Sequence, residues 1–230
     1  MWNNKTFACT QVKYDLYEMK MEYKHSNDLI AYEYAHDLME RRVADIHAGD
    51  ADELLWLLEH PELYTAGSSA KESDLLDARF PVHKTGRGGQ YTYHGPGQRV
   101  GYAMIDLKSR QAVPDIKKYI YQLEEWLIQT IAEWGIKGER RAGRVGIWVD
   151  LSSHGCVGEA KIAAIGVRIR HWVAFHGVAL NVAPDLDNFK GIVPCGLSGF
   201  GVTSLKALGV NASMGDVDRA LKRNFEVVFG

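Results

Sequence analysis

Apolar residues recur every three or four positions in several segments of the chain, which is the spacing of an amphipathic helix. The segment 26–49 predicts a helix whose buried face consists of Tyr32, Ala35, Met39, Val43 and Ile46. Asn27 or Asp28 would cap its first turn, and Gly49 would end it. A second helix is predicted at the end of the chain from the spacing of Val217, Leu221, Phe225 and Val228.

The segment 113–135 has the clearest helical pattern. Pro114 is expected in the first turn, where a proline is tolerated, and Gly135 is expected to end the helix. The apolar stripe predicted to face the core consists of Ile116, Ile120, Leu123, Leu127 and Ile131.

Shorter apolar runs predict strands. The run that begins at residue 52 should end at His60-Pro61, because the residue before a proline rarely continues a regular element. Further strands are expected at 98–107, 145–151 and 161–173, and the last alternates Ile165, Val167 and Ile169 with Gly166, Arg168 and Arg170. The segment 177–184 should be the hairpin partner of 161–173, and a short strand should lie near 202–209.

This order of elements predicts the fold class. A helix followed by runs of strands with few crossover helices is typical of an α+β fold with a mixed, largely antiparallel sheet. A doubly wound parallel sheet would need regular alternation of strands and helices, and the chain lacks it.

Composition narrows the class of protein. The chain has 230 residues, of which 46% are hydrophobic and 24% charged, as in ordinary globular domains. A net charge of −2 gives no support for nucleic-acid binding, and no apolar run approaches the ~20 residues of a membrane span. Residues 1–19 lack the basic region and apolar core of a signal peptide, so we expect a cytoplasmic protein.

Residues 86–98, "GRGGQYTYHGPGQ", contain five glycines just before a predicted strand. They are not a phosphate-binding loop, because no Gly-Lys-[Ser/Thr] follows, and they do not lead from a strand into a helix as a dinucleotide motif does. Two interpretations stay open. The segment is a glycine-rich turn, or it is a floor on which a ligand lies against the backbone, oriented by Arg87, Tyr93, His94 and Gln98.

Cys195 is a candidate nucleophile, because it lies between Pro194 and Gly196 in a loop of small residues. A thiol has a pKa of about 8.5 and needs a group that removes its proton. Lys161 is the candidate, since it begins an apolar strand; it either reaches solvent or is partly desolvated and acts near neutral pH. Cys9 and Cys156 are expected to be small buried residues, and three cysteines do not suggest a disulfide framework.

Two other chemistries are less well supported. A papain-like pair of Cys195 and His94 would lack the local cysteine signature of those enzymes. A zinc site at His154 and Cys156 would need two more ligands at a credible spacing, and the sequence offers none.

Several segments together resemble the octanoyltransferases of lipoate biosynthesis. The core Arg-Gly-Gly-x-x-Thr-x-His-x-x-Gly-Gln at 87–98 carries the resemblance, together with "EHPELYTAG" (59–67), "AGRVGIWVD" (142–150), "KIAAIGVRIRHWVAFHGVALN" (161–181) and "GIVPCGL" (191–197). These segments are jointly specific and cover most of the chain in the expected order. Two departures are Leu197, where isoleucine is expected, and the long approach "SSHGCVGEA" to Lys161.

The resemblance implies a fold like the catalytic domain of biotin and lipoate protein ligases, with residues 1–230 forming a single catalytic domain. It implies that Cys195 and Lys161 are the catalytic pair. It also implies that the acyl group is bound by Arg87, Gly88, Gly89, Gln90, Tyr91, Thr92, Tyr93 and His94, by Ala164, Ile165 and Gly166, and by Gly177, Val178 and Ala179.

The implied reaction moves an octanoyl group from the phosphopantetheine of acyl carrier protein to a lysine of a lipoyl domain, through an octanoyl-Cys195 thioester. The acceptors would be lipoyl domains of 2-oxoacid dehydrogenase complexes and the glycine cleavage H protein. No ATP or metal is expected, and a monomer is favoured. The acidic carrier protein would be steered by Arg140, Arg141 and Arg144 or by Arg168 and Arg170.

Two other functions remain open from the sequence. One is an ATP-dependent lipoate or biotin protein ligase, which shares a glycine-rich loop and a central lysine but needs no cysteine. The other is a non-catalytic protein that binds an acyl group or a lipoyl domain.

Overall fold

The structure is a computed structural model that describes residues 21–193 and 200–230. The strands in this part of the chain are β1 (Met21–Leu29), β2 (Glu53–Glu59), β3 (Leu63–Ala66), β4 (Val82–Lys84), β5 (Tyr91–His94), β6 (Gln98–Asp106), β7 (Ile147–Asp150), β8 (Glu159–Arg170), β9 (Val173–Asn181) and β10 (Gly201–Val202). The α-helices are α1 (Tyr32–Ala48), α2 (Leu107–Arg110), α3 (Ile116–Ala132) and α4 (Met214–Phe229). Short 3₁₀ helices include η2 (Ser152–His154) and η3 (Leu186–Gly191).

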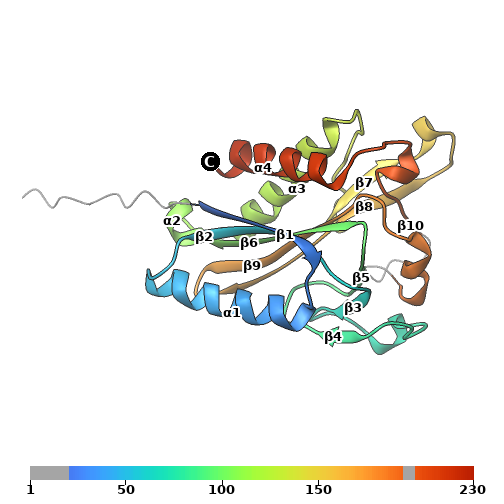
Figure 1. Cartoon of the computed structure of the whole chain (residues 1–230). Helices are drawn as coiled ribbons and strands as arrows, with labels where there is room; N and C mark the ends of the chain where they lie inside the picture. The colour runs from blue at the N-terminus through green and yellow to red at the C-terminus, as the bar shows by residue number, and fades with distance from the viewer. Residues whose placement is uncertain (1–20, 194–199) are drawn as a thin grey trace, which may run out of the picture.

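A mixed sheet forms the centre of the molecule (Figure 1). Among the described residues it has seven strands in the order β1-β2-β6-β9-β8-β10, with β7 also paired to β8. The outer pairs β1–β2 and β8–β10 are parallel, and the other neighbours are antiparallel. A smaller sheet has the order β4-β3-β5. The predicted α+β class with a mixed, largely antiparallel sheet is confirmed.

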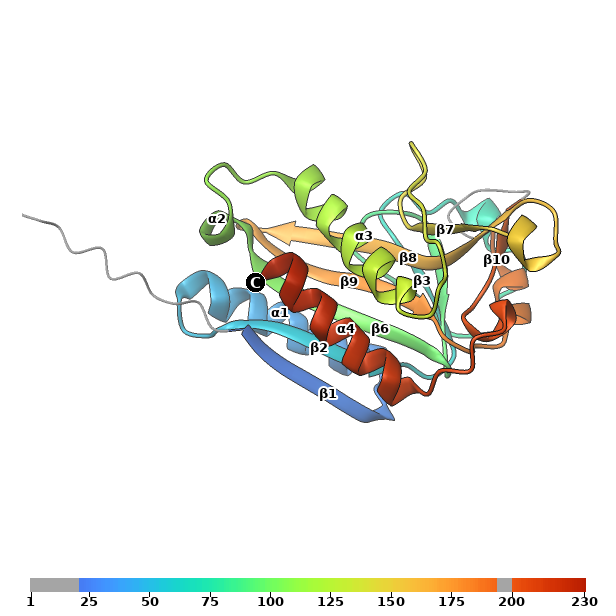
Figure 2. The ribbon, with the colours of Figure 1, turned by 90° about the horizontal axis from the view of Figure 1, so that it is seen from above.

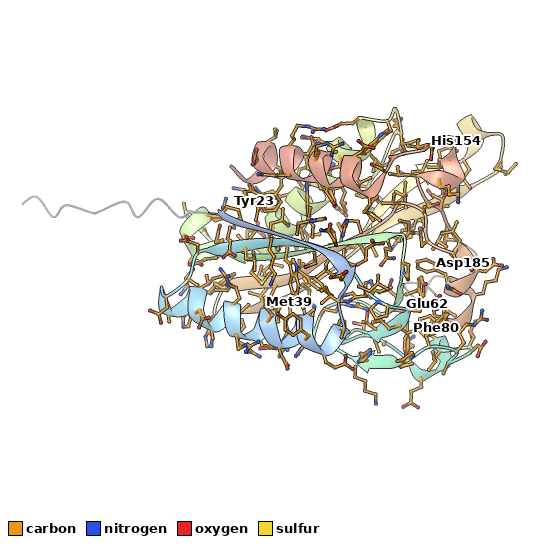
Figure 3. The ribbon with its side chains drawn as sticks, in the orientation of Figure 1. Tyr23, Met39, Glu62, Phe80, His154 and Asp185 are labelled. Atoms are coloured by element: carbon orange, nitrogen blue, oxygen red, sulfur yellow. The ribbon has the colours of Figure 1, made fainter. Side chains whose placement is uncertain are left out.

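Helices cover both faces of the large sheet. Figures 1 and 2 show α3 and α4 side by side on one face, where Trp126 and Phe225 are buried against the strands. The opposite face packs against α1, and Met39 lies between this helix and the sheet (Figure 3). The small sheet lies on the α1 side near the first turn of α1, where the ring of Tyr32 contacts that of His83. In the described part of the chain, no helix is long and apolar enough to cross a membrane.

The helix α1 has the predicted buried face but a different start. Tyr32, Ala35, Met39, Val43 and Ile46 are all buried, and Gly49 ends the helix in the left-handed conformation at φ +81°. The predicted caps Asn27 and Asp28 are wrong, because both lie in β1 and the cap position is Ala31. The strand β1 was not predicted, because this edge strand is mostly exposed and therefore has few apolar residues.

The helix α3 begins one residue after its cap, Asp115, whose carboxylate accepts hydrogen bonds from the backbone N–H groups of Lys117 and Lys118. Pro114 therefore precedes the helix, and its predicted place in the first turn is wrong. Ile116 from the predicted stripe is exposed, whereas Tyr119 and Trp126 are buried. The core-facing side of α3 is thus wider than the stripe read from the sequence.

The predicted hairpin of β8 and β9 is confirmed. His171 and Trp172 form its two-residue turn with φ of 51° and 68°, as in a type I′ turn. The small sheet was not predicted, because β3, β4 and β5 have only three or four residues each and show no usable periodicity.

Candidate active site

A cavity of about 320 Å³ lies between the large sheet and the small sheet, within the size range of small-molecule sites. The glycine-rich segment lines it together with a part of the chain that is distant in the sequence, the hairpin of β8 and β9. Of the residues expected to bind the acyl group or to act in catalysis, the cavity brings together Arg87, Gly89, Gln90, Tyr91, Thr92, His94, Lys161, Ala164, Ile165, Gly166, Gly177, Val178 and Ala179.

Lys161 projects into this cavity from the start of β8 and is only 6% exposed. Its Nζ donates a hydrogen bond to the carbonyl of Val145 at 2.8 Å and lies 4.9 Å from the centre of the Trp148 ring. The register of β7 and β8 shifts beside it, since Ile147 pairs with Ala163 but Trp148 pairs with Lys161. This bulge re-aims the lysine toward the cavity, on the opposite side from Ala163 in the core.

The predicted nucleophile, Cys195, lies outside the described residues, as does Cys9. The chain on both sides of the omitted segment is described. Val193 donates its backbone N–H to the carbonyl of Asp74, and after the segment Val202 pairs with Lys161 in the β8–β10 ladder. The chain that carries Cys195 therefore returns to the sheet directly beside Lys161.

Arg87 holds the glycine-rich segment in place. Its Nη2 donates to the carbonyl and hydroxyl oxygens of Thr65 at 2.8 and 2.7 Å and to the carbonyl of Gln90 at 2.9 Å. Its Nη1 donates to the carbonyl of Gly88 at 2.9 Å. A Cβ on Gly67 would lie 2.7 Å from Nη1, so only glycine fits beside the guanidinium. The arginine thus shapes the cavity wall from within the protein.

A chain of hydrogen bonds continues from Thr65 to the far side of the site. Asn181 Nδ2 donates to the carbonyl of Thr203, so its Oδ1 accepts from Gln98 Nε2. Gln98 Oε1 must then accept from His94 Nδ1 at 2.7 Å, which leaves His94 Nε2 to accept from the Thr65 hydroxyl. Burial lowers the pKa of His94 to about 3, in keeping with this neutral tautomer. His94 is therefore a fixed hydrogen-bonding link, not a free base.

Tyr93 and Gly88 do not line the cavity. Tyr93 points to the other side of β5, where its ring contacts Phe80 and Phe189. Its hydroxyl accepts a hydrogen bond from Asn188 Nδ2 at 3.0 Å, and Asn188 also donates to Glu62 at 2.8 Å. Glu62 and Phe80 are labelled at this end of the molecule in Figure 3. Tyr93 thus contacts the segment that precedes the chain carrying Cys195.

Gly88 donates its backbone N–H to the carbonyl of Val167 at 2.8 Å. This bond ties the glycine-rich segment to β8 and so fixes the distance between two walls of the cavity.

A polar cluster at the α1 side of the cavity was not predicted from the sequence. The hydroxyl of Tyr102 lies 2.7 Å from His60 Nε2, and His60 Nδ1 lies 2.5 Å from the carbonyl of Ile30. A carbonyl only accepts, so Nδ1 carries the proton and Tyr102 donates to Nε2. Burial lowers the pKa of His60 to about 4 and that of His176, a second histidine in the cavity wall, to about 3. The sequence signal was present, since His60 ends one apolar run and His176 interrupts another.

The arginines expected to steer a partner are engaged in ion pairs. Arg140 and Arg141 pair with the carboxylates of Glu124, Glu125, Glu139 and Glu159. Arg144 lies in the cavity wall between the rings of Trp148 and Phe200 and pairs with Glu159 at 2.6 Å. Arg168 and Arg170 share the single carboxylate of Glu40. Arg168 and Arg170 therefore keep an excess of positive charge, whereas the carboxylates around Arg140, Arg141 and Arg144 outnumber those arginines.

Cys156 was expected to be buried and is exposed, so this prediction is wrong. It follows η2 in the loop before β8. Within residues 21–193 and 200–230, no group of three or more histidine, cysteine or carboxylate side chains could hold a metal ion.

The family model of the lipoyl protein ligase A/B catalytic domain matches residues 31–226. An octanoyltransferase of Parvibaculum lavamentivorans is 62% identical over 210 residues, covering 91% of this chain and 92% of that protein. An octanoyltransferase of Paramagnetospirillum magneticum is 60% identical over 91% of this chain and 97% of its own length.

Solved structures show the same fold at low sequence identity. A bipartite lipoate protein ligase from Thermoplasma acidophilum, studied with its E2 lipoyl domain, superposes with a TM-score of 0.66 at 16% identity. The match covers 91% of this chain and 84% of that one. The predicted lipoate-ligase-like fold is confirmed.

Proposed function

The chain belongs to the lipoyl protein ligase A/B catalytic-domain family and catalyses octanoyl transfer in lipoate biosynthesis, and from this premise we propose its route. The octanoyl group passes from the phosphopantetheine thioester of acyl carrier protein to a lysine of a lipoyl domain, through a thioester on Cys195. One observation carries the proposal. Lys161 points into the same cavity as the predicted acyl-binding segments, beside the strand to which the chain returns after Cys195.

In the first half-reaction the sulfur of Cys195 attacks the thioester carbonyl while its proton passes to Lys161 Nζ. The carbon–sulfur bond to pantetheine breaks, and the leaving thiolate takes a proton back from Lys161. The products are octanoyl-Cys195 and the free pantetheine thiol. Burial of Nζ against a carbonyl and an indole ring keeps bulk water away from this proton transfer.

In the second half-reaction the amine of the target lysine attacks the octanoyl-Cys195 carbonyl and gives up a proton to Lys161. The carbon–sulfur bond breaks and an amide remains, with the thiol regenerated on Cys195. A thioester is converted into an amide, which is downhill, so the route needs neither ATP nor a metal.

The cavity suits the hydrocarbon part of this substrate. Its walls include small residues at Ala164, Gly166 and Ala179, which leave room for a chain lying along β8 and β9. Each buried CH₂ group contributes about 0.8 kcal/mol to binding. The acceptors on this route are lipoyl domains of 2-oxoacid dehydrogenase complexes and the glycine cleavage H protein, and the reaction takes place in the cytoplasm.

Intact-mass spectrometry tests the route. We expect octanoyl-acyl carrier protein, without ATP, to add one octanoyl group to the wild-type protein and none to Cys195→Ser. No adduct on the wild type would overturn the covalent route. A parallel sample with octanoate and ATP addresses the ligase alternative. Modification of a lipoyl domain in that sample, retained by Cys195→Ser, would assign the protein to the ATP-dependent ligases instead.

A further inference from the structure

His176 has an unusual backbone for a residue within a strand. Its φ is +62°, in the left-handed region that residues other than glycine rarely occupy. The pairing of β9 with β8 continues through this position without a change of register, whereas the pairing with β6 is interrupted at Phe175 and His176 and resumes at Ala174 in the same register. The strain is therefore not explained by a bulge, and strain of this kind is kept where the side chain it places has a function.

The strained backbone puts the imidazole into the cavity. Side chains alternate between the two faces of a strand, so His176 should share a face with Ala174 and Val178, which belong to the α3 side of the core. Instead its ring stacks on Phe175, its own neighbour in sequence, and approaches Tyr102 on the α1 side. Two consecutive side chains thus lie on the same face.

The imidazole has an atom without a partner. His176 is 2% exposed, and its Nε2 is buried without a hydrogen bond to any described residue. An unsatisfied buried polar atom costs about 1–3 kcal/mol, so a ligand or water at this position would be stabilising. Tyr102 lies nearby and has committed its proton to His60, so its oxygen only accepts. These atoms together offer the two polar partners that a buried water needs.

The position of His176 along the sheet relates it to the acyl chain. His176 pairs with Val167, which is six residues beyond Lys161 on β8. Six residues of strand span roughly 20 Å. An extended octanoyl chain with C–C bonds of about 1.5 Å accounts for roughly 9 Å of this length. A chain that starts at a thioester beside Lys161 and runs along β8 therefore points its methyl end toward His176.

We propose that His176 determines acyl-chain length by holding a water molecule at its own end of the cavity, where it stops the hydrocarbon after the eighth carbon. The proposal rests on the proposed function, because it takes the cavity as the acyl site. A ninth carbon would have to displace the water and would leave Nε2 without a partner and the Tyr102 oxygen without a donor. A terminal hydroxyl on the eighth carbon would instead replace the water and its hydrogen bonds.

Binding of free acids separates these cases without relying on covalent chemistry. Isothermal titration would compare octanoate, nonanoate and 8-hydroxyoctanoate; the last two have the same length and differ only in the terminal group. The variants are His176→Leu and His176→Gln, which are similar in size and equally strained at a positive φ. The control is His36→Leu, which removes a neighbouring imidazole that does not line the cavity. Thermal unfolding would show that each variant is folded.

In the wild type and His36→Leu we expect 8-hydroxyoctanoate to bind about five-fold more tightly than nonanoate, the equivalent of one hydrogen bond. His176→Gln should keep that order because its amide replaces Nε2. His176→Leu should reverse it and bind nonanoate at least as tightly as octanoate. If both variants keep the wild-type order, the role of His176 is overturned while the proposed function stands. If the wild type binds none of these acids, the role of His176 is overturned, while the octanoyl adduct seen by intact mass still decides the covalent route.

Discussion

Lys161 and His176 lie six ladder positions apart along the same cavity, and the backbone is irregular at both. A bulge in the β7–β8 pairing turns the lysine away from the core, and a left-handed residue in β9 does the same for the histidine. In regular strands both side chains would join the apolar core on the α3 side. The regular parts of the strands thus form a rigid cavity wall, and the two irregular positions place polar side chains in that wall.

The two ends differ in how their polar atoms are satisfied. The lysine end is held by a hydrogen bond to Val145, and the chain that carries the predicted nucleophile returns beside it. The histidine end is buried and neutral and leaves His176 Nε2 without a partner in the described chain. A proton can be exchanged at the first end, whereas the second end can only select what fits. We therefore expect changes at the lysine end to alter the rate and changes at the histidine end to alter stability and selectivity.

The largest effect is expected for Lys161→Met, which keeps the apolar stem and removes the amine. Octanoyl transfer to a lipoyl domain should fall by roughly 10²–10⁴-fold, the usual range for loss of a general acid–base group. Octanoate binding should change by less than about three-fold, since the cavity walls are intact. Lys137→Met, at an exposed lysine, is the control. Undiminished turnover in Lys161→Met would show that the lysine takes no part in the reaction. The expected difference between the lysine end and the histidine end would then be wrong.

The next effect is a pH dependence of the free energy of unfolding, which comes from three buried histidines. Burial lowers the pKa of His94 and His176 to about 3 and that of His60 to about 4, against about 6.5 in the unfolded chain. The folded state therefore binds fewer protons. The stability from these groups is complete above pH 6.5 and is lost as the pH falls toward 4 for His60 and toward 3 for His94 and His176. At pH 5.5 the loss is roughly 1–2 kcal/mol for each histidine, or a few kcal/mol in all.

Urea unfolding at pH 7.5 and 5.5 measures this loss. His176→Gln should remove about a third of it, because one of the three buried imidazoles is then absent. The same pH dependence in His176→Gln as in the wild type would show that His176 is not held neutral in the folded state.

A smaller effect tests the hydrogen-bond chain that links Arg87 to Asn181. Thr65→Val removes the hydroxyl that accepts from Arg87 and donates to His94, leaving both buried groups short of a partner. The free energy of unfolding should fall by about 1–3 kcal/mol, measured by urea titration at pH 7.5. Thr65→Ser, which keeps the hydroxyl, should lose less. Equal losses in the two variants would mean that the methyl group of Thr65 matters and the hydrogen bonds do not.

Much of the fold could be read from the sequence because its long elements have one buried face. The apolar face of α1 and the hairpin of β8 and β9 are examples, since each repeats a pattern over many residues. The edge strand β1 and the small sheet were missed because exposed or very short strands carry no such pattern. The helix caps were misplaced for a related reason. Asn27 and Asp28 are good capping residues, but tertiary pairing with β2 uses them in a strand.

The candidate site shows a sharper limit. The glycine-rich segment and the β8 and β9 segments could be found because their residue types recur in a recognisable family. The direction of a single side chain could not. Tyr93 lies within the glycine-rich segment and yet points away from the cavity, because alternation in β5 places it opposite Thr92 and His94. His176 points into the cavity only because of its positive φ, and nothing in the sequence predicts a positive φ at a residue other than glycine.

The smallest effect is expected at the exposed rim outside the histidine end. Glu40 on α1 pairs with Arg168 and Arg170 on β8, and all of these side chains are partly exposed. Water and salt screen such pairs, so Glu40→Gln should lower the free energy of unfolding by no more than about 1 kcal/mol, and less in high salt. Urea unfolding at low and high ionic strength measures both values. A loss above about 2 kcal/mol would mean that the rim holds α1 on the sheet. The packing of α1 on the sheet would then depend on these surface ion pairs as well as on the buried residues around His176.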